Sequence, residues 1–572
     1  MISGEMGELH PSAKVLVRKK VASRIHKKDA SLYAFSQKAQ ECASGFMGWA
    51  DLATNPPYDL AAIKDFADEV VADGINTVVL LGQGGSTQAP MTITKYNKID
   101  SNRVEFRTID SDSPVRVRET LSLSSPEKTL VIVSSKSGGT IEPRLMLCVV
   151  RAAFEQRLAP DEVVKHLVAI TDPGSALEKQ AKEEGWRAVF LGEPTVGGRF
   201  SALSIFGLLP AALVGIDIEN AMKHAVVAEK QCSEDAIDNP AIALASFLYG
   251  NYINGRDKFC FLTPKRGRVL GLWIEQLVAE SVGKEGKGIL PNIEVDSLLL
   301  ASDPGDRCVI IYKTKNDLWD EQNNFEMSLA YIDRHIPRLN YRIDSVEELA
   351  EHFVMWEYAI AMLGFLMKVC PFDQPDVSAA KEKVLEILKD GQPESDFCED
   401  GIGNVPIGTV EVHLSKQFTD CTSLHDALYS LLASIEPGDY FALNAFLPFT
   451  GEYRREALEE IRHSVANACG AASCLEVGPR YLHSTGQLHK GGPNKGVFLI
   501  LSADELKDIP LPQEAESLGS LAKAQAIGDL LTLSERGRRC VHVHLPDNSG
   551  VTLRALSQLI QQILTEITFE RS

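Results

Sequence analysis

Short apolar runs alternate with helical stretches between residues 62 and 225, and this alternation constrains the fold more than any other feature of the sequence. The apolar runs cover residues 75–82, 129–136, 166–171 and 188–192, and a helical pattern covers 145–157. Strands that alternate with helices predict β-α-β units, which build a parallel sheet with helices on its faces. Ligands of such sheets bind in the loops that follow the carboxyl ends of the strands. We therefore expect an α/β fold whose chemistry lies in those loops.

The same pattern recurs in two following blocks, which we place at residues 226–389 and 390–572. A chain of 572 residues exceeds what one hydrophobic core supports, so several domains are expected. The strand-like run 257–264 resembles the run 439–448, and the helix-like runs after them also align, which indicates an internal β-α-β repeat at low identity. Residues 1–61 carry mixed charge and a Pro-Pro break, and they predict a helical arm ahead of the first domain, 62–225.

Composition disfavours several classes of partner. The net charge is −20, which argues against nucleic acid and anionic membranes, because binding many phosphates needs a basic surface. No apolar run reaches the roughly 18 residues that cross a bilayer, and the basic N-terminal segment precedes no apolar signal segment. The 11 cysteines include no C-x-x-C pair, which argues for a reduced compartment and against a disulfide or zinc framework. These features predict a cytoplasmic protein that acts on a small molecule.

The first informative loop is Gly82-Gln83-Gly84-Gly85-Ser86-Thr87, which directly follows a predicted strand. Glycines at a strand-to-helix turn let the backbone approach an anion, and the start of the helix supplies N–H donors. The loop does not fit a dinucleotide fingerprint, because Thr87 stands where the third glycine is required. Two interpretations remain at this point, a phosphate site and an ordinary glycine-rich turn.

The second informative loop is Ser134-Ser135-Lys136-Ser137-Gly138-Gly139-Thr140, again between a predicted strand and a predicted helix. Hydroxyls, a lysine and flexible glycines at the start of a helix make a cradle for a phosphate dianion. The alternative is a serine-rich helix cap. Two such loops on consecutive strands favour the anion site.

Five segments resemble, in order, those of the glucose-6-phosphate isomerases. They are Gly84-Gly85-Ser86, Ser135-Lys136-Ser137-x-x-Thr140, Gly197-Gly198-Arg199-Phe200-Ser201 with the LSIFGLLPAAL that follows, Ala279-Glu280-Ser281-x-Gly283-Lys284, and Phe372-Asp373-Gln374-Pro375 ending at Lys381. From residue 28 to the last helix, the chain looks like the isomerase half of bifunctional transaldolase/glucose-6-phosphate isomerases, without the transaldolase half. The resemblance implies two sugar isomerase (SIS) domains plus an extra C-terminal α/β block. It also implies the glycolytic and gluconeogenic interconversion of glucose 6-phosphate and fructose 6-phosphate through a cis-enediol, with no cofactor and no metal.

The resemblance also assigns roles to individual residues. Glu280 matches the family's catalytic base and stands at the end of a predicted helix, and Arg199 matches the arginine that stabilises the enediolate. Gln374 is assigned to substrate hydrogen bonding and Lys381 to the ring oxygen or phosphate; a spacing of seven residues places both on one face of a helix. The remaining substrate-binding residues are those of the glycine- and serine-rich loops, Gly85, Ser86, Ser135, Lys136, Ser137, Thr140 and Gly198.

The chain departs from the family pattern at one point. Simpler members place a ring-opening histidine soon after the base, in a segment that reads LHSxGQ, but the corresponding segment here, 298–301, has no histidine. The motif appears instead in the third block, as Leu482-His483-Ser484-Thr485-Gly486-Gln487. Our hypothesis is that the extra block supplies His483 to the site within the same chain, which predicts an active monomer; a homodimer stays open. The alternative is a structural histidine in a glycine-bounded turn.

Three other functions compete with this interpretation. A non-catalytic sugar-phosphate sensor is the first, because SIS folds also serve as binding modules, although a sensor has no reason to keep Glu280 and Lys381 together. An isomerase that also accepts mannose 6-phosphate is the second, since that epimer differs only at C2. A nucleotide-binding oxidoreductase ranks last, because neither glycine loop fits it.

Overall fold

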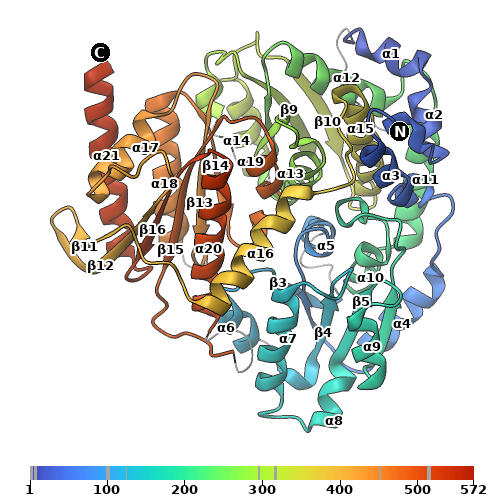
Figure 1. Cartoon of the computed structure of the whole chain (residues 1–572). Helices are drawn as coiled ribbons and strands as arrows, with labels where there is room; N and C mark the ends of the chain where they lie inside the picture. The colour runs from blue at the N-terminus through green and yellow to red at the C-terminus, as the bar shows by residue number, and fades with distance from the viewer. Residues whose placement is uncertain are drawn as a thin grey trace. The chain divides into compact units, whose positions relative to one another are not determined.

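The computed structural model describes residues 4–5, 9–97, 103–123, 125–293, 295, 297–314, 319–449, 452–511 and 517–571 (Figure 1). The chain divides into two compact units. Unit 1 comprises residues 1–110, 121–283 and 287–373, and unit 2 comprises 111–120, 284–286 and 374–572. Each unit is described by itself below.

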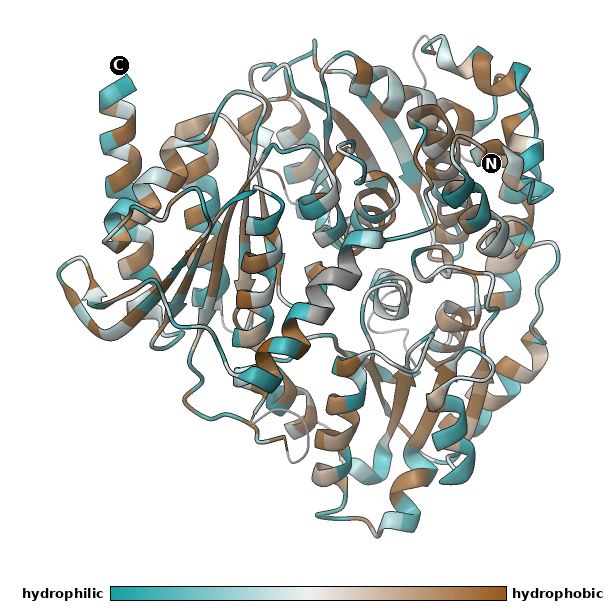
Figure 2. Ribbon diagram, in the orientation of Figure 1, coloured by the Kyte–Doolittle hydropathy of each residue, from teal (hydrophilic) through white to brown (hydrophobic). Residues whose placement is uncertain are grey.

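The first sheet of unit 1 is parallel and has the strand order β3-β2-β4-β5-β6. Its strands are β2 (Thr77–Leu81), β3 (Glu105–Ile109), β4 (Thr129–Ser134), β5 (Leu167–Thr171) and β6 (Ala188–Leu191). Its helices are α4 (Leu60–Ala72), α5 (Gly85–Tyr96), α7 (Ile141–Phe154), α8 (Pro160–Val163), α9 (Ala176–Glu183) and α10 (Ile205–Leu213). Every residue of β2, β4 and β5 is buried, as expected for parallel strands covered on both faces, and the strands of this sheet are mostly brown, that is hydrophobic, in Figure 2.

The second sheet of unit 1 has the order β1-β10-β9-β7-β8. It consists of β7 (Lys258–Leu262), β8 (Leu290–Ile293), β9 (Arg307–Thr314) and β10 (Arg338–Ile343), all parallel, with the two-residue β1 (Gly4–Glu5) antiparallel at one edge. The surrounding helices are α11 (Ile218–Cys232), α12 (Pro240–Ile253), α13 (Arg268–Val282), α14 (Trp319–Leu329) and α15 (Leu349–Met367). Helix α15 is long and apolar enough to cross a membrane, but 89% of its most apolar 18-residue stretch is buried inside the protein, as in a core helix.

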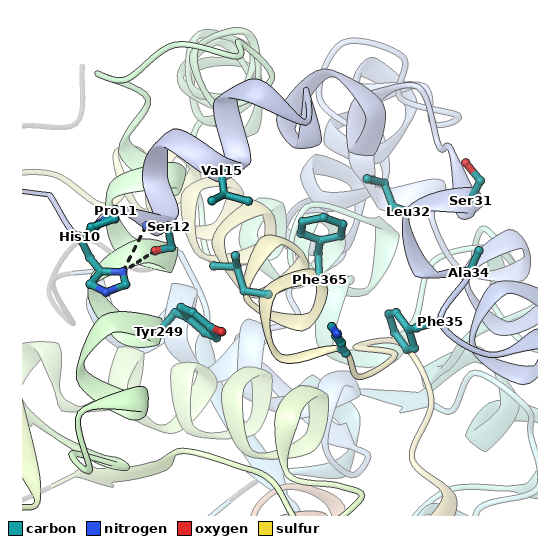
Figure 3. A pocket seen from close by; sticks show the side chains of 12 residues that line it. His10, Pro11, Ser12, Val15, Ser31, Leu32, Ala34, Phe35, Tyr249 and Phe365 are labelled. Atoms are coloured by element: carbon teal, nitrogen blue, oxygen red, sulfur yellow. Dashed lines mark hydrogen bonds between the residues drawn. The ribbon is translucent and has the colours of Figure 1, made fainter.

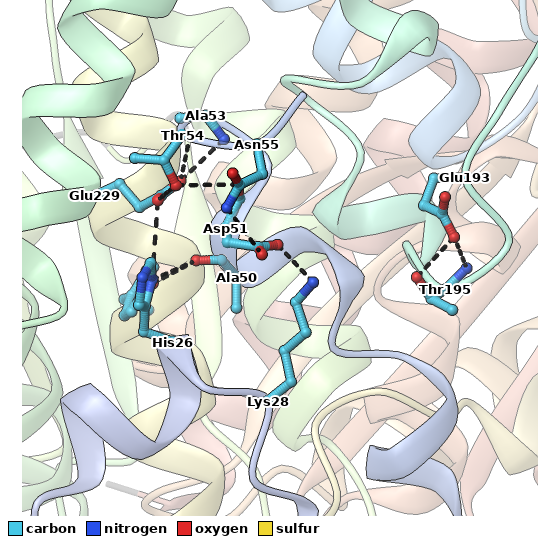
Figure 4. A network of polar contacts seen from close by, with 11 residues as sticks. His26, Lys28, Ala50, Asp51, Ala53, Thr54, Asn55, Glu193, Thr195 and Glu229 are labelled. Carbon is cyan, nitrogen blue, oxygen red and sulfur yellow. Dashed lines mark hydrogen bonds and ion pairs between the residues drawn. The ribbon is translucent and has the colours of Figure 1, made fainter. Parts of the chain in front are cut away.

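The N-terminal residues of unit 1 pack on its core as short helices, α1 (Ser12–Arg18), α2 (Val21–His26) and α3 (Gln37–Gly45). A polar network anchors this arm (Figure 4). The carboxylate of Glu229, on α11, accepts hydrogen bonds from the amides of Ala53 at 2.9 Å and Thr54 at 3.2 Å, and His26 lies 3.8 Å from it. Burial raises the pKa of Glu229, and the amides of Thr54 and Ala53 oppose that rise.

Unit 2 holds one sheet of order β11-β12-β16-β15-β13-β14. The strands are β11 (Phe397–Ile402), β12 (Val405–Leu414), β13 (Tyr440–Phe446), β14 (Ala472–Val477), β15 (Gly496–Ala503) and β16 (Arg539–Leu545). Strands β13 to β16 are parallel, and the hairpin β11–β12 adds two antiparallel strands at one edge. The helices that begin within unit 2 are α6 (Pro114–Ser122), α16 (Pro375–Asp390), α17 (Leu424–Ala433), α18 (Glu452–Cys469), α19 (Gly486–Gly491), α20 (Leu518–Glu535) and α21 (Gly550–Arg571).

The three sheets share a strand order. In each, one strand (β2, β7 or β13) pairs on one side with the next strand along the chain and on the other side with the strand after that, and the following strand lies beyond. The order is thus β3-β2-β4-β5 in the first sheet, β8-β7-β9-β10 in the second and β14-β13-β15-β16 in the third. The two runs aligned in the sequence, 257–264 and 439–448, contain β7 and β13, which occupy the same place in this order.

Candidate functional site

The glycine-rich turn after β2 starts helix α5 at Gly85. Gly84 precedes the helix at φ +55°, a left-handed conformation that favours glycine. A Cβ atom on Gly85 would lie 2.1 Å from the carbonyl oxygen of Gly198, so the two backbones are in direct contact. Any side chain at position 85 would push them apart. This contact joins two of the segments that carry the family resemblance.

The serine-rich loop after β4 lies beside the first turn, because β2 and β4 are neighbours in the sheet. A Cβ atom on Gly82 would lie 3.1 Å from the carbonyl oxygen of Ser134, which shows how closely the two loops approach. Thr140 is the residue before helix α7, but its side chain makes no capping hydrogen bond, and the hydroxyls of Ser135 and Thr140 lie 3.4 Å apart. The side chain of Ser137 is exposed. The loop therefore presents hydroxyls at a helix start whose capping position is not used, which favours the anion-binding interpretation over a serine cap.

Lys136 makes an ion pair that the sequence does not reveal. Its ammonium lies 2.5 Å from the carboxylate of Asp172 and donates to the carbonyl of Pro194 at 2.9 Å. Burial raises the pKa of Asp172, and Lys136 opposes that rise by stabilising the charged form. A bound phosphate would have to share Lys136 with Asp172.

Glu280 stands in the last turn of helix α13, which ends at Val282 ahead of Gly283. Its side chain is 9% exposed, so the carboxylate is withdrawn from bulk water. The amide of Gln276, one helical turn earlier, donates to Glu280 at 3.2 Å, and the guanidinium of Arg199 lies 3.5 Å away. A buried carboxylate needs such partners, since burying an unpaired charge is costly.

Arg199 is held in place by groups from two other segments of unit 1. It lies in the short 3-10 helix η6 (Gly198–Phe200), directly after the glycine that contacts Gly85. Its Nε donates to the hydroxyl of Ser281 at 2.8 Å, and its Nη2 donates to the carbonyls of Pro371 at 2.6 Å and Asp373 at 2.9 Å. These bonds fix a permanently charged group beside Glu280. The sequence motif identifies Arg199 but not these anchoring contacts.

An aromatic cluster around Phe200, the residue after Arg199, was not predicted from the sequence. Trp49, from the N-terminal arm, stacks on Phe200 at a centroid distance of 4.9 Å, and Phe372 lies 5.4 Å from Phe200. Phe200 and Phe372 each belong to a segment that carries the resemblance, which was the available signal. Trp49 had none, because it lies in the arm whose function the sequence does not indicate.

The remaining candidate residues belong to unit 2. The prediction that Gln374 and Lys381 share a face of one helix is wrong for Gln374, because helix α16 begins at Pro375 and Gln374 is its exposed capping residue, at φ −144°. A proline disfavours the helical conformation of the residue before it and lacks the N–H that a longer helix would need. Lys381 lies within α16, but its side chain is outside the described residues.

His483 ends the one-turn helix η9 (Arg480–His483) and is half-buried. Helix α19 follows at once and is tied to the start of α16 by a reciprocal pair: the amide of Asp376 donates to Gln487 at 3.0 Å, and Gln487 donates to the carboxylate of Asp376 at 2.7 Å. Within unit 2, the His483 segment and the start of the helix that carries Lys381 are thereby joined. The predicted site residues thus fall in two groups, one in each unit.

A cavity of about 690 Å³ in unit 1 contains none of the candidate residues (Figure 3). It lies beside the first helix of the arm and the end of α15, and is lined by His10, Pro11, Ser12, Val15, Ser31, Leu32, Ala34, Phe35, Tyr249, Phe365, Leu366 and Lys368. Its lining is mostly apolar and includes one cation, Lys368. It is therefore poorly suited to a sugar phosphate.

Comparison with known proteins identifies the family. A family model described as phosphoglucose isomerase matches residues 60–295, which include the glycine-rich turn, the serine-rich loop, Arg199 and Glu280. A glucose-6-phosphate isomerase of Mycoplasmopsis pulmonis is 29% identical over 390 residues, which span 60% of this chain and 90% of that protein. Residues 60–295 of the chain match the glucose-6-phosphate isomerase family. A second member, from Fusobacterium nucleatum, is 28% identical over 426 residues, 64% of this chain and 90% of that protein.

Solved structures agree on the fold. A hypothetical protein from Thermus thermophilus superposes with a TM-score of 0.55 at 22% identity, covering 67% of this chain and 98% of that one. A glucose-6-phosphate isomerase from Chlamydia trachomatis gives a TM-score of 0.55 at 18% identity, covering 66% of this chain and 85% of that one. The predicted fold class, parallel α/β sheets flanked by helices, is confirmed.

Proposed function

We propose that the chain interconverts glucose 6-phosphate and fructose 6-phosphate through a cis-enediol, with Glu280 as the base that moves the proton. The observation that carries the proposal is the buried pair of Glu280 and Arg199, 3.5 Å apart, with the guanidinium fixed by Ser281 and two backbone carbonyls. The printed names of the family relatives support the choice of substrate.

The substrate phosphate binds the serine-rich loop in this proposal. The start of α7 offers backbone N–H groups and the positive end of a helix dipole, and Ser135, Ser137 and Thr140 offer hydroxyl donors. The start of α5, with Gly85 and Ser86, lies after the neighbouring strand and is available to a second polar group of the sugar. Gly198 touches Gly85, so the segment bearing Arg199 adjoins this anion site.

Proton transfer then follows from the chemistry of a carboxylate beside a fixed cation. Glu280 removes the proton on C2 of the open-chain aldose and the electrons form the enediolate. The same carboxyl returns the proton at C1 while the hydroxyl proton passes from O2 to O1, which gives the ketose. Negative charge develops on the substrate oxygens during this step, and a fixed guanidinium such as Arg199 stabilises that charge without reorganising. Placing both groups away from bulk water strengthens their interaction.

Ring opening must precede proton transfer, and we assign it to unit 2. His483 would protonate the ring oxygen while the C1 hydroxyl loses its proton. Gln374 would hydrogen-bond the sugar, and Lys381 would contact the ring oxygen or phosphate. The joined segments of Gln374, Lys381 and His483 within unit 2 are consistent with a common task.

The test measures glucose 6-phosphate formation from fructose 6-phosphate in an assay linked to a dehydrogenase, with a chelator present. Glu280→Gln should lower kcat by roughly 10²- to 10⁴-fold, because the amide keeps the shape of the side chain but cannot accept the proton. Glu275→Gln is the matched control, since Glu275 is a buried glutamate of the same helix, and it should retain activity. No turnover in the wild-type protein, with binding of the sugar phosphate retained, would instead identify a sensor. Turnover of mannose 6-phosphate would show the relaxed specificity.

A further inference from the structure

A cluster of three potential metal ligands lies in unit 2, apart from the residues assigned to the isomerase reaction. Cys474 and Glu476 are two residues apart on strand β14 and therefore point to the same face of the sheet. His489 lies on helix α19. The thiol sulfur, a carboxylate oxygen and an imidazole nitrogen all lie within 4.8 Å of one another.

All three side chains are withdrawn from solvent. Relative exposure is 3% for Cys474, 4% for Glu476 and 1% for His489. Neither ring nitrogen of His489 has a hydrogen-bond partner among the described residues, and the ring is surrounded by Tyr440, Tyr481 and Phe498 at centroid distances of 4.9–6.0 Å. A buried imidazole whose two nitrogens lack protein partners is destabilising, which calls for an explanation.

The donor set matches one class of ligand. A thiolate, a carboxylate and a neutral imidazole are the donors that bind Zn²⁺, and three such donors leave a fourth position of a tetrahedron open. The two anionic donors balance the charge of a divalent ion. Lys490, the residue after His489, is paired with Asp529 at 2.5 Å, which offsets its charge. We propose that Cys474, Glu476 and His489 form a binding site for a divalent metal ion of borderline softness such as Zn²⁺.

The site has a structural consequence for the neighbouring segment. The chain leaves β14 at Val477 and enters α19 at Gly486, and residues 478–485 between them include His483. An ion bound to both elements would brace this segment at its two ends. His483 would then be positioned by a metal that does not itself contact substrate, so the site does not depend on the proposed isomerase reaction.

The test uses the reduced full-length chain, stripped of metal and titrated with Co²⁺ alone. The wild-type chain should bind one Co²⁺ with a sulfur-to-cobalt charge-transfer band, and Zn²⁺ should abolish the band by displacing the cobalt. Cys474→Ser should lose the band. Cys540→Ser, which alters another buried cysteine of unit 2, should retain it.

Cys42→Ser discriminates against a rival site. Cys42, Cys370 and Asp373 of unit 1 are the other group of close donors among the described residues, and loss of the band in Cys42→Ser would overturn the proposal. Absence of the band in the wild-type chain, or its survival in Cys474→Ser, would also overturn it. Should Cys474→Ser fail to fold, His489→Gln and Glu476→Gln replace it: both should keep the band but require more Co²⁺ to reach it, and unchanged affinity in both would contradict the assignment.

Discussion

The first sheet of unit 1 and the sheet of unit 2 share a strand order. The loops that follow their equivalent strands differ, because one is rich in hydroxyl side chains and the other begins with two carboxylates. After β4, the chain continues with Ser135 and a hydroxyl-rich loop at the start of a helix. After β15, which has the same place in its sheet, the chain continues with Asp504 and Glu505. The carboxylate of Asp504 pairs with the imidazole of His544 at 3.1 Å, so this side chain is already engaged in a contact within the protein.

The difference separates what a fold provides from what a site requires. A parallel sheet places loops together at the carboxyl ends of its strands whatever their sequence. An acidic loop repels a phosphate dianion, whereas hydroxyls and helix N–H groups attract it. We therefore expect the phosphate to bind at the first sheet only, while the sheet of unit 2 contributes His483 and a buried polar cluster.

The test with the largest expected effect removes His483, the proposed contribution of unit 2 to ring opening. His483→Asn should lower kcat by roughly 10²-fold or more, because asparagine can hydrogen-bond but cannot deliver a proton to the ring oxygen. The loss should be measured on the normal, mainly ring-closed substrate at saturating concentration. Near-normal rates would mean that unit 2 plays no part in ring opening and that His483 is structural.

A second test compares alanine substitutions at the two equivalent loop positions. Ser135→Ala should raise KM for fructose 6-phosphate by about 10-fold, because a hydrogen bond to a charged phosphate contributes roughly 1.5–3 kcal/mol. Asp504→Ala, at the equivalent position after β15, should leave KM unchanged. Initial-rate kinetics on the two variants decide the matter: a larger effect of Asp504→Ala than of Ser135→Ala would reverse the assignment of the phosphate site.

A smaller expected effect concerns the pH dependence of the stability of unit 1, which tryptophan fluorescence follows separately from unit 2. Burial lowers the pKa of His352 in unit 1 to about 3, and the hydroxyl of Tyr312 lies 3.0 Å from its ring. The folded state therefore keeps His352 neutral, whereas the unfolded state protonates it below pH about 6.5. Its contribution to stability is complete above that pH and is lost as the pH falls toward 3, by up to about 1.4 kcal/mol per pH unit.

All 5 tryptophans of the sequence, including Trp49 and Trp356, lie in unit 1, so tryptophan fluorescence reports the unfolding of that unit. In urea titrations followed by fluorescence, the free energy of unfolding should fall more steeply between pH 6.5 and 4 in the wild-type chain than in His352→Gln. The exposed His335→Gln provides the control and should keep the wild-type slope. Equal slopes in the wild-type chain and His352→Gln would show that another group governs acid unfolding.

The sequence predicts the central strands better than the edges and helix starts. Strands β2, β4, β5, β7 and β13 were recognisable because each is a largely apolar run, as buried parallel strands are. Strand β3, with the polar sequence EFRTI, lies at a sheet edge and gives no such signal. The start of α16 was misplaced because a spacing argument ignored the restriction that Pro375 imposes on Gln374.

The candidate site was predicted through motifs, and its geometry was not. Glu280 and Arg199 are 81 residues apart in the sequence, and only the fold shows that their side chains pair. The bonds from Arg199 to the carbonyls of Pro371 and Asp373 involve the backbone, which no side-chain pattern reveals. The Cys474, Glu476 and His489 cluster escaped notice because its donors come from a strand and a later helix rather than from a paired Cys motif.

The most direct test of the central claim follows the proton itself. Wild-type enzyme should convert fructose 6-phosphate in D₂O into glucose 6-phosphate with deuterium at C2, read by proton NMR, because a carboxyl that holds the substrate proton exchanges it with solvent before returning it. Glu280→Gln should incorporate none, while Glu275→Gln should match the wild type. Wild-type product without deuterium would show that the carboxyl returns the proton faster than it exchanges with solvent. Deuterium at C2 in the product of Glu280→Gln, formed at the wild-type rate, would assign the base to another residue and contradict the account.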